Sequence, residues 1–129
     1  MASYVKFQPF VEALAEKVHN LGSDTIKVAL TNTAPTNTFA TLSQVTEISY
    51  TNLSSRTVTI SASSQTSGTY KLVLADLILT ASGGTVGPFR YIVIYNDTAT
   101  NDELIAYYDY GSAVTLQDGE TLTLDFSAS

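Results

Sequence analysis

The chain has 129 residues, about the size of one domain, and 44% of them are apolar, which is enough for a single buried core. Only 14% are charged, and 19 threonines and 14 serines take the place of the missing charges, so we expect a polar but largely uncharged surface. The net charge of −6 and the lack of any Lys/Arg cluster argue against a nucleic-acid groove or a basic membrane patch. The absence of cysteine excludes disulfides, thiol catalysis and cysteine-based metal sites.

The first predicted element is an amphipathic helix over residues 9–21. Pro9 suits its first turn, because proline has no N–H to lose there. Four apolar side chains then recur at spacings of four, four and three and share one face: Phe10, Leu14, Val18 and Leu21. Gly22 follows where a left-handed C-cap belongs, and His19 lies near the negative helix end, where a histidine is commonly a favourable end charge. Residues 1–8 are predicted to form an N-terminal arm, and either this arm or the segment 32–55 is expected to reach neighbouring subunits.

Strand patterns follow, and residues 24–129 are predicted to complete a single domain spanning 1–129. Residues 25–31 alternate between apolar and other side chains, as in a strand with one buried side. Residues 32–55 are predicted to make a long surface excursion that holds at most one short strand. Further strands are predicted at 56–61, 70–80, 89–95 and 103–110, with a bulge or bend near Asp76 in the second of these.

Two details decide the expected fold class. Residues 89–95 are apolar on both faces, which predicts a central strand in a sheet covered on both sides. Asp118-Gly119 joins two alternating runs, which predicts a hairpin, because both turn residues tolerate positive φ. About seven short strands with regular turn signals predict a mainly β protein: an antiparallel β-sandwich or jelly-roll-like fold with one N-terminal α-helix.

No motif predicts a catalytic centre. The glycine-rich stretch at 83–87 lacks the spacing and the Lys-Ser/Thr pair of a nucleotide loop, so it is interpreted as a flexible connection between strands. His19 is the only histidine, and no catalytic triad can be built around it. Six loop acids are interpreted as solvated, although calcium binding or a small hydrolase acting through them stays an alternative: Asp97, Asp102, Glu103, Asp109, Asp118 and Glu120. We therefore predict no enzyme, no cofactor and no metal site.

Tyrosine is the more informative residue type, at eight copies with no tryptophan. Several tyrosines fall in two neighbouring strand candidates, where they can stabilise a sheet by cross-strand pairing or contact a partner protein. Arg90 is predicted to be structural, with its guanidinium stacked on a tyrosine or paired with Asp97 or Asp109; an interface role is its alternative. The candidate interface residues are Tyr4, Phe7, Arg90, Tyr91, Tyr107, Tyr108 and Tyr110.

Four stretches carry a resemblance to a known group of proteins: FVEALAEKVHNLGSDTIKVALTNTAP at 10–35, YTNLSSRTVT at 50–59, TSGTYKLVLADLILTASGG at 66–84 and GPFRYIVIYNDTATNDELIAYYDYG at 87–111. Together they cover most of the chain. They resemble small structural proteins that tailed bacteriophages and prophages encode in their virion gene clusters. The resemblance supplies no matched set of binding residues.

The resemblance implies a capsid decoration, or cement, protein. Such a protein binds the outer surface of the expanded head as a dimer or trimer and bridges neighbouring capsomers. The expected partners are the major capsid protein and further copies of this chain, with no nucleic acid and no membrane. The expected location is the capsid surface of the virion, after assembly in the cytoplasm of the host bacterium. The alternative is a tail component or a receptor- or glycan-binding module of the same virion.

Overall fold

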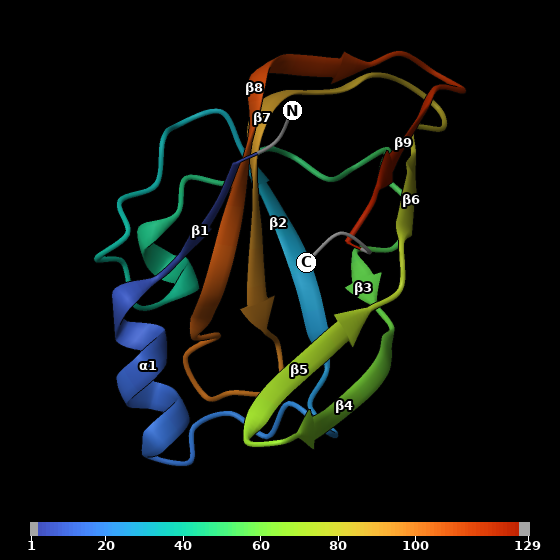
Figure 1. Cartoon of the computed structure of the whole chain (residues 1–129). Coiled ribbons are helices and arrows are strands. Elements are labelled where there is room, and N and C mark those ends of the chain that lie inside the picture. Colours follow the sequence, from blue (N-terminus) through green and yellow to red (C-terminus); the bar gives the residue numbers. More distant parts are fainter. Residues whose placement is uncertain (1–2, 127–129) are drawn as a thin grey trace.

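The computed structural model describes residues 3–126, which are built around a five-stranded antiparallel sheet (Figure 1). In spatial order its strands are β1 (Ser3–Lys6), β8 (Leu104–Leu116), β7 (Val86–Asn96), β2 (Ile26–Thr31) and β3 (Thr57–Val58). Two antiparallel ribbons accompany it: β4 (Ile60–Thr66) with β5 (Thr69–Leu74), and β6 (Leu77–Thr80) with β9 (Thr121–Leu124). The helices are α1 (Gln8–Ala15) and the short 3₁₀ helix η1 (Leu42–Gln44).

The predicted fold class, mainly β and antiparallel with one N-terminal α-helix, is confirmed. The finer assignment to a sandwich or jelly roll stays a prediction. The strands opposite the five-stranded sheet form two separate ribbons and not a second continuous sheet.

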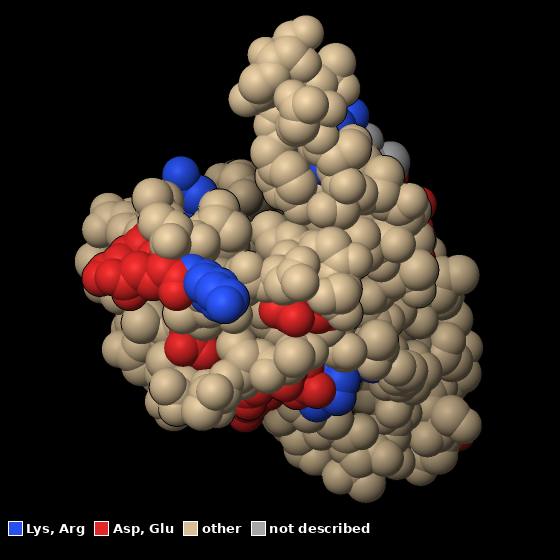
Figure 2. All heavy atoms as spheres, turned by 90° about the horizontal axis from the view of Figure 1, so that it is seen from below, with Lys and Arg blue, Asp and Glu red and all other residues tan. Residues whose placement is uncertain are grey.

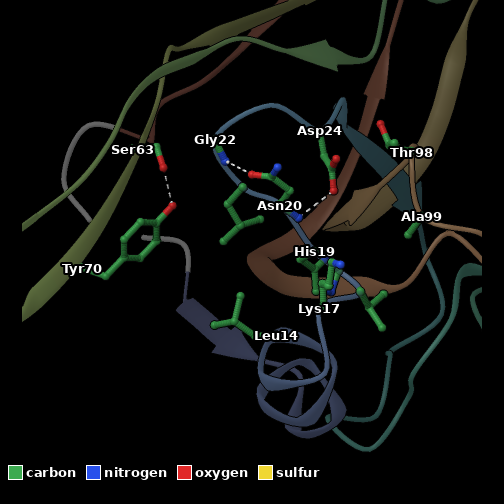
Figure 3. Close-up of a pocket in the computed structure, with 12 residues that line it drawn as sticks. Leu14, Lys17, His19, Asn20, Gly22, Asp24, Ser63, Tyr70, Thr98 and Ala99 are labelled. Atoms are coloured by element: carbon green, nitrogen blue, oxygen red, sulfur yellow. Dashed lines mark hydrogen bonds between the residues drawn. The ribbon is translucent and has the colours of Figure 1, made fainter.

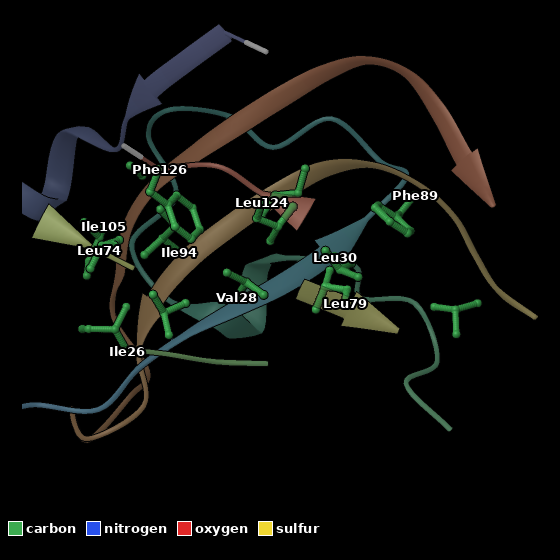
Figure 4. Close-up of a cluster of buried hydrophobic side chains, with 14 of the residues drawn as sticks. Ile26, Val28, Leu30, Leu74, Leu79, Phe89, Ile94, Ile105, Leu124 and Phe126 are labelled. Atoms are coloured by element: carbon green, nitrogen blue, oxygen red, sulfur yellow. The ribbon is translucent and has the colours of Figure 1, made fainter. Parts of the chain in front are cut away.

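The main core lies between the five-stranded sheet and the two ribbons (Figure 4). The sheet contributes Ile26, Val28, Leu30 and Ile94, and the ribbons contribute Leu74, Leu79 and Leu124. On the opposite face of the sheet, Ala29 and Val93 form a second buried cluster with Val45 from the excursion between β2 and β3. β7 is therefore buried on both faces, as its continuous apolar run predicts.

The N-terminal segment is part of this sheet, so the predicted arm is wrong for residues 3–8. β1 pairs with β8, and the next residue, Phe7, is fully buried and donates its N–H to the Ile105 carbonyl over 3.1 Å. Burying an aromatic side chain stabilises the fold by about 2–3 kcal/mol, which an arm in solvent would forgo. Gln8 then begins α1; residues 1 and 2 lie outside the described residues.

The helix is shorter than predicted and ends at Ala15. Lys17 adopts a left-handed conformation with φ 70°, and the chain reverses through two hydrogen bonds: Lys17 N–H to the Leu14 carbonyl and Val18 N–H to the Ala13 carbonyl. These two bonds define a Schellman cap with lysine where glycine is usual. Gly22 is consequently not the cap, and Leu14, predicted to face the core, is exposed.

The predicted hairpin at Asp118-Gly119 is also wrong, although the turn is present. The strand before it, β8, pairs with β7 and β1, whereas the strand after it, β9, pairs with β6. The turn is held by contacts distant in sequence, since Gly119 N–H donates to the Ala81 carbonyl and the Asp118 carboxylate accepts from Gly83 N–H. The chain therefore crosses from one sheet to another at this turn.

The other strand predictions are met in part. Residues 62–66, which lie between the predicted strands 56–61 and 70–80, belong to strand β4, and the turn after them is Ser67-Gly68, both with positive φ. The predicted strand 70–80 is broken into β5 and β6 near Asp76, whose Oδ1 accepts the Phe126 N–H, so the expected bend is confirmed. The excursion contains η1 and isolated bridges but no strand of its own.

The two edges of the five-stranded sheet differ in how their backbone groups are covered. Beyond the short β3, side chains and loop backbone cover the β2 edge: Arg56 Nη1 donates to the Val28 carbonyl and Tyr50 Oη accepts the Leu30 N–H. Arg56 also stacks 3.8 Å from the centre of the Tyr50 ring. The opposite edge is formed by β1, which pairs with β8 alone in the five-strand order. A strand that has one partner among the described strands is a natural place for another chain to add.

Candidate functional site

The candidate interface residues fall on both faces of the five-stranded sheet. Tyr4 and Tyr108 are opposite one another in the β1–β8 register, on the face that carries the ribbons, and their rings meet edge to face at 5.4 Å. Tyr91 and Tyr107 lie on the other face with ring centres 6.2 Å apart. Tyr110 is exposed at the start of an irregular stretch of β8. The sequence pattern therefore grouped residues that the fold separates.

Arg90 is held by Asp109 of the neighbouring strand. Its Nε lies 2.8 Å from Oδ1 and its Nη2 lies 3.1 Å from Oδ2, a bidentate pair, and its guanidinium carbon is 5.3 Å from the centre of the Tyr91 ring. The hydrogen bonds from Arg90, and then from the Gly111 N–H, lower the pKa of the Asp109 carboxyl. The expected pairing with a strand carboxylate is thus present, and it fixes the Arg90 side chain on the sheet surface.

Phe7 does not belong to an interface of this molecule. Its side chain is fully buried, with its ring 5.2 Å from that of Tyr107, in the cluster that also contains Val93 and Leu104. A residue enclosed on all sides cannot contact a partner without unfolding β1. The alternation of β1 explains the difference, because Tyr4 and Phe7 point to opposite faces of the sheet.

A cleft lies between the β4–β5 hairpin, α1 and the ribbon-bearing face of the sheet, and it is called here the hairpin cleft. It consists of two adjoining hollows of about 420 and 620 Å³ that share Leu14, Leu21 and Tyr70. The smaller hollow is mostly apolar: its remaining lining residues are Tyr4, Phe10, Thr69, Lys71, Leu72, Leu74, Ile94, Ile105, Ala106, Tyr108 and Phe126. Three large apolar or aromatic side chains are exposed at its rim: Tyr4 (55%), Leu14 (42%) and Tyr70 (46%).

The hairpin that bounds the cleft stands out from the body of the protein. Every residue from Ser61 to Lys71 is exposed, and Lys71 is the only charged residue between Ile60 and Leu74. Figure 2 shows this hairpin as a lobe that carries no red atoms, projecting from a surface on which charges are sparse. Within this hairpin, Tyr70 Oη and Ser63 Oγ are hydrogen-bonded over 2.7 Å (Figure 3).

The larger hollow has polar walls that include His19, Asn20 and Asp24 (Figure 3). His19 is 94% buried, since only 6% of its surface is exposed, and it lies beyond the end of α1, so its predicted role as a helix-end charge is wrong. Its Nδ1 is 2.9 Å from the Asn96 amide nitrogen, which also donates to Asp24 Oδ2 over 2.6 Å. The amide nitrogen can only donate, so Nδ1 accepts and the imidazole is neutral.

The other predicted sites resolve into structural contacts. Asp97 forms an ion pair with Lys27 at 3.2 Å, and the Glu120 carboxylate accepts the Gln117 N–H in the turn before β9. Within residues 3–126, no three His, Asp or Glu side chains gather closely enough to bind a metal ion. The glycine-rich stretch at 83–87 was predicted to connect two strands, and this holds in part: residues 83–85 lie between β6 and β7, whereas Val86 and Gly87 belong to β7. None of the helices in the described part of the chain is long and apolar enough to cross a membrane.

The sequence pattern did not reveal the hairpin cleft. The spacing of Leu14 predicts that it shares the apolar face of a longer helix, and Tyr70 begins the predicted strand 70–80. The alternation of Tyr70 and Leu72 beside a Ser-rich strand is the signal that could have identified a projecting hairpin. The closure of the cleft by distant segments has no signal in any local window.

Comparisons with protein-family models, with curated proteins and with solved structures find no match to this chain.

Proposed function

We propose that this chain is a structural protein of a tailed-bacteriophage virion, which decorates the outer surface of the head and stabilises neighbouring capsomers by non-covalent contacts. The observation that carries the proposal is the hairpin cleft, whose rim exposes Tyr4, Leu14 and Tyr70. A contiguous exposed apolar patch on a small domain is characteristic of a contact surface. The resemblance of the chain to small virion proteins supports the same conclusion.

The remaining surface suits this role. It is polar and carries few charges, so it can approach a protein shell without a large desolvation cost for charged groups. The partners in this proposal are the major capsid protein and further copies of this chain, as a dimer or trimer. Many copies on a symmetric shell gain strength from multivalency, so each contact can be modest. No catalysis is required.

The experiment is to add the purified protein to expanded heads that lack it and to image them by electron cryo-microscopy. Ordered density at local two-fold or three-fold positions supports the proposal. A Leu14→Ser/Tyr70→Ser variant should occupy fewer sites, whereas Ile78→Ser should bind normally, because Ile78 is 58% exposed but lies outside the cleft lining. Heads that stay bare at saturating wild-type protein contradict the proposal.

A second candidate is a tail component or a receptor- or glycan-binding module of the same virion. The larger hollow favours it, because the half-exposed Tyr70 ring stands beside a small set of polar groups that include Asn20 and Ser63. An aromatic surface with a few placed polar groups is the usual composition of a small-ligand site. Glycan-array binding that Tyr70→Ser abolishes, together with particles that carry the protein on the tail, would select this candidate.

A further inference from the structure

Lysines that form no ion pair with another described residue lie in and beside the hairpin cleft. Among the described residues, three cations have ion-pair partners: Lys27 with Asp97, Arg56 with Glu47 and Arg90 with Asp109. The other three, Lys6, Lys17 and Lys71, are exposed and have no carboxylate within 4.0 Å in the part of the chain described. Lys17 lines the larger hollow and Lys71 the smaller one.

Lys6 belongs to the same surface. It is opposite Ala106 in the β1–β8 register, and Ala106 lines the smaller hollow. Alternation along β1 places Lys6 on the same face as Tyr4. In a chain of net charge −6, two of the three described cations without an ion pair therefore line the cleft, and the third lies on the same face of the sheet, opposite a lining residue.

Few carboxylates line the cleft. Asp24 is the only acidic residue among those described that lines either hollow. Its Oδ2 already accepts hydrogen bonds from the Asn96 amide and from the Asn20 N–H. The cleft is therefore complementary to a ligand that brings negative charge to an apolar groove.

The backbone of β5 supplies a second recognition element. The turn Ser67-Gly68 is a two-residue hairpin loop with positive φ at both positions, so the flanking Thr66 and Thr69 form a hydrogen-bonded pair. Alternation along the antiparallel ladder then directs the N–H and C=O groups of Tyr70 and Leu72 away from β4. The smaller hollow is lined by β5 residues and by none from β4, so this free edge borders the cleft.

We propose that the hairpin cleft binds an extended, acidic strand of a partner protein. The strand adds antiparallel or parallel to the free edge of β5, places alternate apolar side chains in the smaller hollow and directs its carboxylates to Lys6, Lys17 and Lys71. This is strand addition to a sheet edge, in which main-chain hydrogen bonds give affinity and side-chain pockets give specificity. The inference rests on the proposed function, because it names the chemistry of the segment that the contact surface receives.

The test uses a fluorescein-labelled peptide of alternating leucine and aspartate or glutamate, and a matched peptide in which lysine replaces each acid. Fluorescence anisotropy with the full chain should show binding of the acidic peptide that weakens as salt is raised. Lys6→Glu/Lys71→Glu should weaken binding of the acidic peptide about tenfold, given the usual strength of exposed ion pairs. The same variant should gain affinity for the basic peptide. Equal binding of both peptides to the wild type would overturn the inference.

The backbone contact is tested by N-methylating alternate residues of the acidic peptide. Two peptides are compared, one methylated at its odd positions and the other at its even positions. One of them should lose binding and the other should keep it, because only every second N–H group of the bound strand faces β5. Equal effects of the two methylation patterns would refute strand addition. Leu14→Ser should weaken binding, and Ile78→Ser should not.

Two outcomes separate this inference from the proposed function. Heads that bind the protein while the acidic peptide does not would leave the decoration role in place and overturn the acidic strand. A dimer in light scattering that Lys71→Glu dissociates, with no peptide binding, would show that a second copy occupies the cleft and would likewise overturn it. Peptide binding with bare heads would support the strand and contradict the decoration role.

Discussion

His19 Nδ1 accepts a hydrogen bond from the Asn96 amide over 2.9 Å, which ties the segment after α1 to the end of β7. Asn96 cannot reverse its amide without loss, because its Oδ1 already accepts the N–H groups of Thr98 and Ala99. Protonation of His19 Nδ1 would therefore place its N–H group against the N–H groups of the Asn96 amide, with no acceptor between them. Burial lowers the pKa of His19, with the charges of Glu103 and Asp24 opposing the shift.

We expect stability to fall on acidification through this residue. The unfolded chain protonates His19 near its ordinary pKa of about 6.5, while the folded chain does so only at lower pH. The unfolded state then holds the extra proton, so stability is lost as the pH falls below about 6.5, by up to about 1.4 kcal/mol per pH unit. Urea unfolding at a series of pH values measures this loss of unfolding free energy. His19→Gln should flatten the profile between neutral pH and the onset of carboxylate titration; an unchanged slope would assign the proton uptake elsewhere.

Lys17→Gly should stabilise the protein. Lys17 has φ 70° at the Schellman cap, a conformation that costs a residue with a Cβ about 1–2 kcal/mol and glycine little. After the greater backbone entropy of glycine in the unfolded chain is subtracted, we expect a gain of about 0.5–1 kcal/mol in chemical denaturation. Lys17→Ala removes the charge but keeps the strain and serves as the control. Equal stability of the two variants would show that the cap is not strained.

Gly87→Ala should destabilise β7 strongly. A Cβ there would lie 2.6 Å from the Val114 carbonyl oxygen, at a φ of 114° that L residues rarely adopt. We expect a loss of about 3 kcal/mol from strain and overpacking together, read from thermal or urea unfolding. Gly111→Ala is the matched control, because its φ is 99° but no atom lies within 4 Å of the added Cβ. Similar losses for both would mean that the carbonyl moves aside.

Tyr50→Phe should remove the hydrogen-bond acceptor of the Leu30 N–H at the edge of β2. Tyr50 Oη accepts the Leu30 N–H over 2.9 Å and donates to Glu47 Oε1 over 2.7 Å, and burial is the main cause that raises its pKa. The variant leaves the Leu30 N–H without this acceptor, which costs about 1–3 kcal/mol. Faster hydrogen exchange of the Leu30 amide, with little change at Ile92 on the far side of the pair, is the expected signature. An unchanged exchange rate at Leu30 would show that the Tyr50 hydroxyl does not protect this amide.

Features that depend on the apolar pattern along a single strand were predicted well. β2 and β7 followed from alternation and from a continuous apolar run, and their pairing with neighbours in the sheet is regular. The bend at Asp76 followed from a single acid in an apolar stretch. The pairing of Arg90 with a strand carboxylate was one of the predicted alternatives, and the structure selects Asp109 over Asp97.

Features that depend on distant contacts were predicted poorly. Asp118-Gly119 has the local chemistry of a hairpin turn, yet the pairing of its flanking strands is decided by β6 and β7. The excursion before β3 lacks periodicity because its residues act singly, as Tyr50 and Arg56 do on the β2 edge. His19 is buried by a loop that begins 77 residues further along the chain at Asn96. No local window contains that information.

Among the described residues, the two sides of the five-stranded sheet differ: Tyr50 and Arg56 occupy backbone groups on the β2 side, whereas β1 pairs with β8 alone. A backbone group that already has a hydrogen-bond partner offers nothing to an incoming strand, so a strand that extended this sheet would add beside β1 and not beside β2. The same sheet therefore resists extension in one direction, which restricts the ways in which two copies could pair edge to edge.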